Sequence, residues 1–457
     1  MDGQIDSEPL YDMIVVGSGI AGLHVAVEML RGHPRARVAV LEKYKALGGR
    51  TSTFRQEGSA GKPALQWESG AGRFSTQHTR LLGLLKRYGL TFVPIGSKVV
   101  YKGSAATPLE DSVFESGLPV FMDSLARLPA DDLARHTVRQ LLEKIHGPKL
   151  AGDYLVRYPY RAELETMRAD LALEFFRGEL GTQEGFGICK EGLGALVEKM
   201  VAHIERLGGS VHRNHELVGV EKGETRQPLR LQLRIGSPKE GAARPLVELR
   251  AARVVLAVEA AALSEIPGLP LWGGLKHLKM TPLLRMYAVF PREGGGGPLW
   301  TEAADAGAGA RIVTAGHVRY LIPAGGDAVQ ISYTDSQDAD YWKAIIDEKG
   351  ETAAGTQAVE ELRQLLRADI PSPSLIKTHY WRHGVTNWLP GSYDPRELSQ
   401  AALRPFAQEM PALHFCGESF SLRQGWIEGA IEHADALLKM IGSRAGPKNA
   451  SSNKKQK

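Results

Sequence analysis

The chain has 457 residues, of which 43% are hydrophobic and 24% are charged, a composition typical of globular proteins. A chain of this length is too long for one simple core, so we expect more than one domain. The formal net charge is +4, and five basic residues among the last fourteen account for it. The rest of the chain is therefore nearly neutral, which argues against a nucleic-acid-binding surface.

Cysteine content and the N-terminus indicate the compartment. Cys189 and Cys416 lie far apart and form no CxxC pair, so neither a disulfide framework nor a zinc site is expected. His212 and His215 have no third ligand nearby, so we expect no metal. The first residues, "MDGQIDSEPLYD", are acidic and polar, unlike a signal peptide, and no uncharged stretch could cross a bilayer. We expect a cytoplasmic protein without a membrane segment.

The first element with a clear pattern is an apolar run over residues 11–16, which predicts a buried parallel strand. It leads into the sequence G-S-G-I-A-G, with Gly17, Gly19 and Gly22, and then into a helix with apolar residues at helical spacing. The first glycine permits the tight turn, the second lets a pyrophosphate approach the backbone, and the third lets the helix pack on the strand. This pattern predicts a dinucleotide-binding unit whose helix begins at Ile20 and Ala21.

A second predicted strand, residues 37–41, ends at Glu42, twenty residues after Gly22. A carboxylate at this position accepts hydrogen bonds from a ribose diol in dinucleotide-binding folds. We therefore assign Glu42 and its neighbour Lys43 to the cofactor site. The alternative is a glycine turn followed by an ordinary surface glutamate.

Three further blocks occur in a fixed order along the chain. The first is "LEKYKALGGRTSTF", which contains Gly48, Gly49 and Arg50; the second is "WESGAGRFS", residues 67–75. The third is "LHFCGESFSLRQGWIEGAIEHADAL", residues 413–437. Together with the glycine motif they resemble the flavin-containing amine oxidase superfamily, which includes the monoamine oxidases and L-amino-acid oxidases. The stretches "LRMYAVF", "RYLIP", "ISYTDSQDADYW" and "HGVTNWLPGS" are also similar to a subgroup encoded by large DNA viruses and protists.

The resemblance implies FAD as the cofactor. The helix predicted from Gly429 onward, within the third block, would direct a second N-terminus at the flavin. Beyond the residues above, it assigns cofactor contacts to Gly70, Ala71, Gly72, Arg73, Val218 (through its backbone), Gly417, Glu418, Gly425, Trp426, Ile427 and Ala430.

The same resemblance implies two aromatic walls for the substrate site. One wall is Trp426, and the other is Tyr393 in the segment "GSYDP". Either residue could instead serve ordinary packing. Monoamine oxidases hold their flavin through a cysteine where this chain has Ser392, and a serine cannot form that thioether. The FAD is therefore expected to be non-covalent.

Arg73 occupies the place of the arginine that grips the substrate carboxylate in L-amino-acid oxidases, a role that suits a planar guanidinium. The alternative is that Arg73 binds only flavin or backbone oxygens. The match departs at Gly72, where those oxidases usually carry methionine. The tyrosine that assists the arginine has no clear counterpart here, because Tyr320 is displaced by a residue or two.

Arg285 stands where many members of the superfamily place a lysine beneath the flavin, bridged by water to N5. Arginine keeps the positive charge there, but it is bulkier and stays protonated. This replacement leaves open whether O2 is the efficient electron acceptor. The alternative is a strand arginine that extends to the surface.

We expect an α/β fold in which a Rossmann-type FAD-binding domain is interleaved with an α+β substrate-binding domain. The former would comprise residues 1–95, 189–265 and 405–442, the latter residues 96–188 and 266–404, with a disordered basic tail at 443–457.

The function implied is oxidation of the C–N bond of an amine or L-amino acid by hydride transfer to flavin N5. Reoxidation by O2 would give hydrogen peroxide. Two alternatives stay open: C–C dehydrogenation, as in desaturases and protoporphyrinogen oxidases, and a non-catalytic flavin-bound interaction protein. Expected partners are a small-molecule substrate and O2, with an oligomer left open.

Overall fold

The computed structural model describes residues 10–58, 64–96, 99–103, 123–179, 185–222, 228–237, 244–290, 310–325 and 327–442. The basic tail predicted at 443–457 lies outside these residues. Within them, no helix is both long and apolar enough to cross a membrane.

A five-stranded parallel sheet carries the glycine motif. Its strands follow the order β10 (Ser210–His212), β3 (Val38–Leu41), β2 (Met13–Val16), β14 (Val254–Leu256) and β20 (Leu413–Phe415). The sheet thus joins segments from the beginning, middle and end of the chain. Its apolar strands are buried on both faces, as parallel sheets require.

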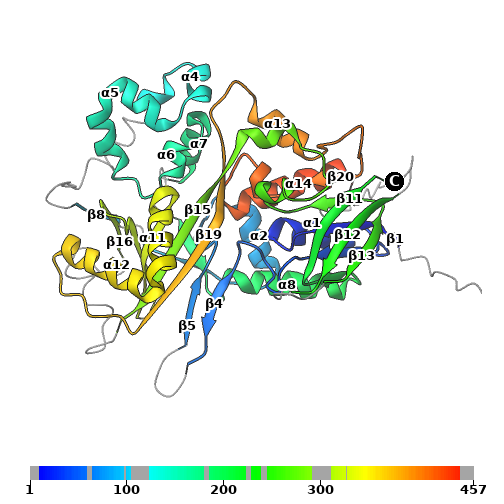
Figure 1. The fold of residues 1–457 in the computed structure, drawn as a ribbon, viewed down its shortest axis with the longest axis horizontal. Helices are drawn as coiled ribbons and strands as arrows, with labels where there is room; N and C mark the ends of the chain where they lie inside the picture. The colour runs from blue at the N-terminus through cyan, green and yellow to red at the C-terminus, as the bar shows by residue number, and fades with distance from the viewer. Residues whose placement is uncertain are drawn as a thin grey trace, which may run out of the picture.

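Helix α1 (Ile20–Gly32) packs beside this sheet, and its residues 20–30 are all buried. It contacts α8 (Leu193–Arg206) and α14 (Ile427–Met440), so the last helix of the described chain lies beside the first (Figure 1). Leu23, Val27 and Leu30, which predicted this helix, are fully buried. Together the sheet and helices confirm the predicted α/β fold.

A four-stranded sheet flanks this unit, in the order β1 (Leu10–Tyr11), β13 (Leu246–Ala251), β12 (Leu229–Ile235) and β11 (His215–Glu221). The strand predicted over 11–16 is therefore divided, because Tyr11 pairs with β13 while β2 pairs with β3 and β14. Asp12 separates the two pieces, and its carboxylate accepts a hydrogen bond from the Arg37 amide.

The other large sheet has six strands. Their order is β19 (Leu375–Trp388), β15 (Leu278–Val289), β18 (Ala328–Asp335), β17 (Tyr320–Gly325), β16 (Arg311–Thr314) and β8 (Val99–Lys102). The two long strands β15 and β19 run side by side through the middle of the molecule (Figure 1). Helices α11 (Ser336–Lys349) and α12 (Glu351–Leu366) pack against this sheet, separated by Gly350 in a left-handed conformation (φ 88°).

The helices of residues 130–179 gather beyond one end of the six-stranded sheet (Figure 1): α4 (Ala130–Arg135), α5 (Val138–Leu155), α6 (Ala162–Glu165) and α7 (Ala169–Glu179). Two small sheets pair β4 (Thr53–Gln56) with β5 (Leu65–Glu68), and β6 (Phe74–Ser75) with β9 (Phe186–Cys189) and β7 (Phe92–Pro94). The remaining elements are α2 (Thr79–Arg87), α9 (Ala260–Leu263), α13 (Pro395–Ala402) and the 3₁₀ helices η1 (Gly273–His277) and η2 (Glu418–Phe420).

Candidate active site

The three glycines of the first motif have different surroundings. A Cβ added to Gly17 would lie 2.4 Å from the Ala257 carbonyl oxygen, and one added to Gly22 would lie 2.2 Å from the Gly17 oxygen. At Gly19 an added Cβ would meet no atom within 4 Å. Gly17 and Gly22 are therefore needed for packing, whereas Gly19 leaves open space at the start of α1, whose first turn has no acidic residue. A phosphate fits such a position.

Glu42 lies directly behind this turn and is 7% exposed. Its Oε2 accepts hydrogen bonds from the Ser18 amide (3.0 Å) and hydroxyl (2.7 Å), and its Oε1 accepts one from the Tyr44 amide (3.0 Å). The neighbouring Lys43 points to Glu216, with Nζ 3.1 Å from Oε1. Glu42 thus retains a carboxylate beside the glycine turn, while the charge of Lys43 is already paired.

Val218 lies in β11 where the register with β12 shifts between Leu217 and Gly219. A residue at such an irregularity is left out of regular strand pairing. This placement is compatible with the backbone contact that the sequence assigns to Val218.

Gly48 and Gly49 meet the first glycine motif. Gly48 forms an isolated β-bridge with Gly19, and its amide lies 3.2 Å from both the backbone and hydroxyl oxygens of Ser18. Both glycines have positive φ angles (103° and 57°), which favour glycine at these positions. The structure thus brings two of the predicted cofactor-binding segments together.

Glu418 connects Arg50 to the C-terminal block. Its Oε2 lies 2.7 Å from Nη2 of Arg50 and accepts from the Thr386 hydroxyl (3.1 Å). Its Oε1 accepts from the amides of Thr386 (3.2 Å) and Gly425 (2.7 Å). Because Glu418 is 7% exposed, this is a mostly buried ion pair with three further hydrogen bonds.

The block containing Gly70 and Ala71 packs on the same arginine segment. A Cβ on Gly70 would lie 1.9 Å from the Arg50 carbonyl oxygen, which also accepts the Ala71 amide at 2.9 Å. Gly417, with φ 135°, faces Ala21 at the start of α1. Helix α14, which begins at Ile427 and includes Ala430, packs against α1, so both helices belong to one region.

Arg73 is enclosed by aromatic residues. Its Nη2 donates to the Tyr160 hydroxyl (2.6 Å) and its Nη1 to the Tyr320 hydroxyl (3.2 Å). The expectation that Tyr320 is displaced from Arg73 is therefore wrong, because the tyrosine at the start of β17 reaches it directly. The guanidinium also lies 5.3 Å from the Phe186 ring centre. In the described parts of the chain, Arg73 has no carboxylate within 4 Å.

Arg285 is 6% exposed, so it does not extend to the surface. Its guanidinium lies 4.5 Å from the Tyr333 ring centre, and its Nη1 donates to the Glu68 carbonyl oxygen at 3.3 Å. A Cβ on Gly72 would lie only 2.8 Å from this Nη1. The two departures from the family pattern are therefore in contact: the absence of a side chain at Gly72 provides the space that the larger Arg285 occupies.

Titratable side chains close to Arg285 have shifted pKa values. Burial raises the pKa of Glu68 to about 7, although its carboxylate accepts hydrogen bonds from the Leu193 amide and Thr53 hydroxyl. Burial and the nearby charge of Arg285 lower the pKa of His379 to about 4. At neutral pH His379 is uncharged, so it adds no positive charge to this region.

Trp426 lies at the N-cap of α14, and its ring faces His78, Phe175 and Phe186, with centre distances of 4.8, 6.0 and 6.3 Å. Its buried indole nitrogen has no hydrogen-bond partner within the described structure. Phe186 also borders Arg73, so Trp426 and Arg73 border one aromatic region.

Tyr393, the other predicted wall residue, packs against a different set of side chains. β19 continues to Trp388, and the turn that follows packs the Tyr393 ring 4.0 Å from His277 and beneath Arg168. Its hydroxyl donates to the Leu389 carbonyl oxygen. The rings that face Trp426 are those of His78, Phe175 and Phe186, which the sequence did not single out. The Tyr393 ring packs on His277 instead.

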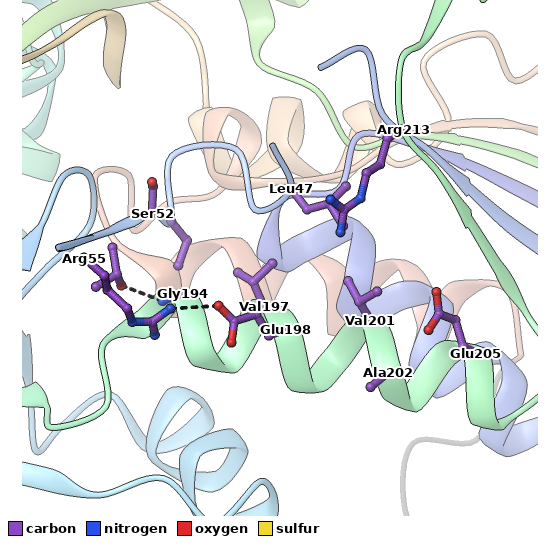
Figure 2. A pocket seen from close by; sticks show the side chains of 12 residues that line it. Leu47, Ser52, Arg55, Gly194, Val197, Glu198, Val201, Ala202, Glu205 and Arg213 are labelled. Carbon is purple, nitrogen blue, oxygen red and sulfur yellow. Dashed lines mark hydrogen bonds and ion pairs between the residues drawn. The ribbon is translucent and has the colours of Figure 1, made fainter. Parts of the chain in front are cut away.

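A separate cavity of about 400 Å³ lies between α8 and the segment 47–55 (Figure 2). Val197, Val201 and Leu47 form apolar parts of its lining, and Arg55 pairs with Glu198 at its edge. None of the predicted site residues lines this cavity. Within the described chain, no cluster of three potential metal ligands occurs either.

The predicted cofactor-binding segments have features that fit a flavin dinucleotide. Open space at a helix N-terminus, a buried carboxylate behind it and an unpartnered indole nitrogen are features that a phosphate, a ribose and a heterocycle would use. Gly19, Glu42 and Trp426 supply these features.

Solved structures share this fold. A putrescine oxidase bound to putrescine superposes with a TM-score of 0.70 at 18% identity, covering 95% of this chain and 100% of that chain. Cyclohexylamine oxidase from Brevibacterium oxydans gives 0.68 at 20% identity, covering 95% and 100%. A protein from Exiguobacterium, provisionally assigned as a protoporphyrinogen oxidase, gives 0.66 at 15% identity, covering 95% and 99%. At these identities the likeness establishes the fold.

The family itself follows from the sequence match. The model of the flavin-containing amine oxidoreductases matches residues 20–436, which is most of the chain. The similarity to the viral and protist subgroup stays a prediction. The chain belongs to the family of flavin-containing amine oxidoreductases and is an FAD-dependent oxidoreductase.

Proposed function

We propose that this protein oxidises the C–N bond of a carboxylate-bearing amine, an L-amino acid, to an imine, which water hydrolyses to a carbonyl compound and ammonia. The observation that supports this substrate class is Arg73, bound by the hydroxyls of Tyr160 and Tyr320 without a carboxylate partner among the described residues. A largely desolvated guanidinium gains most from an anion that arrives with the substrate. A simple amine, which has no carboxylate, is the less favoured substrate.

Charge also argues against a diamine substrate. Arg285, which is itself buried, contributes a second positive charge beside Gly72, next in sequence to Arg73. A dication would be repelled by both arginines, whereas a carboxylate would be attracted. An apolar substrate for C–C dehydrogenation would leave the Arg73 charge unpaired, which makes that alternative less favourable.

In the proposed mechanism, the protein positions the substrate and excludes water. The turn at Gly19 and the carboxylate of Glu42 would hold FAD, which would supply the hydride acceptor for the substrate carbon. Arg73 and its two tyrosines would hold the carboxylate, while Trp426 and the phenylalanines beside it cover the apolar part. Arg285 would place positive charge close to the reacting region. We propose O2 as the electron acceptor and hydrogen peroxide as the product.

The predicted domain division stays part of the proposal. The parallel sheet draws on all three segments assigned to FAD, and the six-stranded sheet draws on both segments assigned to the substrate. We also propose a reducing compartment such as the cytoplasm, because both cysteines are buried free thiols.

The substrate class is testable by anaerobic reduction of the flavin. The purified yellow protein should bleach faster with phenylalanine than with phenethylamine, a pair that differs only in the carboxylate. If the amine bleaches the flavin as fast as the amino acid, or faster, in several such pairs, the protein is an oxidase of simple amines. Bleaching by a polyene alone would favour C–C dehydrogenation, and bleaching by none of these substrates would favour a non-catalytic role.

We expect the FAD to be released completely by acid or heat precipitation. Ser392 cannot form a thioether, and the two cysteines of the chain are buried, with Cys416 fully enclosed in the core beside α1. All yellow colour should therefore appear in the supernatant, measured by absorbance near 450 nm. Colour that stays with the pellet would contradict non-covalent binding.

Replacing Gly72 by methionine should displace the Arg285 guanidinium without unfolding the protein. The first added carbon would lie 2.8 Å from Nη1, the mobile end of a long side chain, so the arginine can move away. Flavin reduction should slow and the flavin spectrum should change. Adding Arg285→Lys should restore much of the loss, because lysine is slimmer, with a coupling energy of about 0.5–3 kcal/mol. Additive effects of the two changes would contradict the steric link.

A further inference from the structure

The two tyrosines that bind Arg73 come from distant segments, and each is adjacent in sequence to an arginine. Tyr160 precedes Arg161 at the start of α6, and Tyr320 follows Arg319 at the start of β17. The Tyr160 and Tyr320 ring centres lie 5.9 Å apart in an edge-to-face arrangement. Contacts that hold Arg161 and Arg319 in place therefore also position the two tyrosine hydroxyls that bind the Arg73 guanidinium.

Asp335, the last residue of β18, fixes the backbone after Tyr160. Its two carboxylate oxygens accept the Arg161 amide at 2.9 and 3.1 Å, and one of them also accepts the Ala162 amide at 3.1 Å. Asp335 is only 4% exposed, so these backbone donors are satisfied by the protein rather than by water. The carboxylate thereby ties the tyrosine-bearing segment to the six-stranded sheet.

Arg319 makes a second link to the same segment. It is 1% exposed, has a positive φ of 55° and donates from Nη2 to the Tyr158 carbonyl oxygen. Its Nε lies 3.8 Å from Asp338, whose carboxylate also accepts Nε of Arg161 at 2.5 Å. The segment that carries Tyr160 and the strand that carries Tyr320 thus share one buried network.

We propose that Asp335 is a positioning residue for the substrate carboxylate: it holds Tyr160 against Arg73 and so sets the affinity for carboxylate-bearing substrates. The inference rests on the proposed role of Arg73. Loss of the Asp335 carboxylate leaves two buried amides without an acceptor, and the segment must move to find new partners. A shift of the Tyr160 hydroxyl releases one side of the guanidinium, while the site that receives the amine stays in place.

The test compares Asp335→Ala with the wild-type holoenzyme, using phenylalanine and phenethylamine in flavin-reduction assays. The KM for phenylalanine should rise about ten- to a hundredfold, the range for a small misplacement of a binding group, with little change in kcat. The constants for phenethylamine should stay nearly unchanged. A fluorescence titration with benzoate, which has a carboxylate and no amine, should show a matching rise in Kd. Asp340→Asn is the control, because this exposed carboxylate on α11, the helix that follows Asp335, contacts only the Tyr380 hydroxyl among the described residues.

The two hypotheses fail in different ways. If the wild-type enzyme does not distinguish phenylalanine from phenethylamine, the proposed role of Arg73 is wrong. If it does distinguish them but Asp335→Ala changes both substrates equally, or neither, Asp335 is not a positioning residue. Should the alanine variant not fold, Asp335→Asn serves in its place. It keeps one acceptor oxygen but turns an NH₂ group towards the backbone amides. The KM for phenylalanine should again rise while the constants for phenethylamine stay nearly unchanged.

Discussion

Replacing Arg73 by methionine should lower kcat/KM for amino acids by some two to three orders of magnitude. The substrate carboxylate would then be buried without its partner, a loss of about 3–4 kcal/mol in transition-state stabilisation. The matching amines never make this contact, so their kcat/KM should stay equal or rise. Stopped-flow flavin reduction with paired substrates, such as phenylalanine and phenethylamine, measures both effects.

Arg73→Lys is the matched control for charge. Lysine keeps the positive charge but presents one ammonium group instead of a planar fork, so it cannot bind the Tyr160 and Tyr320 hydroxyls in the same geometry. Its kcat/KM for amino acids should fall between those of the wild type and the methionine variant. An equal fall for both members of each substrate pair would show that Arg73 serves the flavin instead.

Removing the Glu418 carboxylate should destabilise the protein by about 3–5 kcal/mol, the range for breaking a buried ion pair. In Glu418→Ala the Arg50 guanidinium loses its partner, and the amides of Thr386 and Gly425 lose their acceptor. FAD content should fall as well, because the loop with Gly48 and Gly49 is no longer tied to the C-terminal block. Urea unfolding in excess FAD, with flavin absorbance per polypeptide, measures both losses.

The control for Glu418 is the surface pair of Arg55 and Glu198. Their Nη1 and Oε1 atoms lie 2.8 Å apart, close to the ion-pair distance at Glu418, but both side chains are exposed (41% and 66%). Glu198→Ala should cost no more than about 1 kcal/mol, as is usual for solvent-screened pairs. If Glu418→Ala costs as little, then Glu418 does not join the two segments.

The parts predicted from the sequence are those that local backbone geometry imposes. Gly17 and Gly48 need positive φ angles, and Gly22 has no room for a Cβ, so these positions must carry glycine whatever binds there. The helical spacing of apolar residues in α1 follows equally from local structure. The parallel sheet and the order of the flavin-related segments were therefore predictable.

The aromatic surroundings of Arg73 were not predictable in the same way. Tyr160 lies 87 positions from Arg73 in a segment without any motif, and only the tertiary fold brings their side chains together. The small offset of Tyr320 in the sequence argues against this contact, but the placement of β17 brings its hydroxyl to Arg73. At Tyr393 the local pattern fits a wall residue, but the turn that carries it directs the ring to His277.

The arrangement of the parallel sheet has a consequence for how the chain folds. β14 pairs with β2 on one side and with β20 on the other, and β20 begins only at Leu413. During synthesis, the sheet edge along β14 is therefore uncovered until residues 413–415 have left the ribosome. Contacts over such separations form slowly, and an uncovered strand edge invites association with other chains. Early termination before residue 413 should yield aggregates rather than a smaller folded domain.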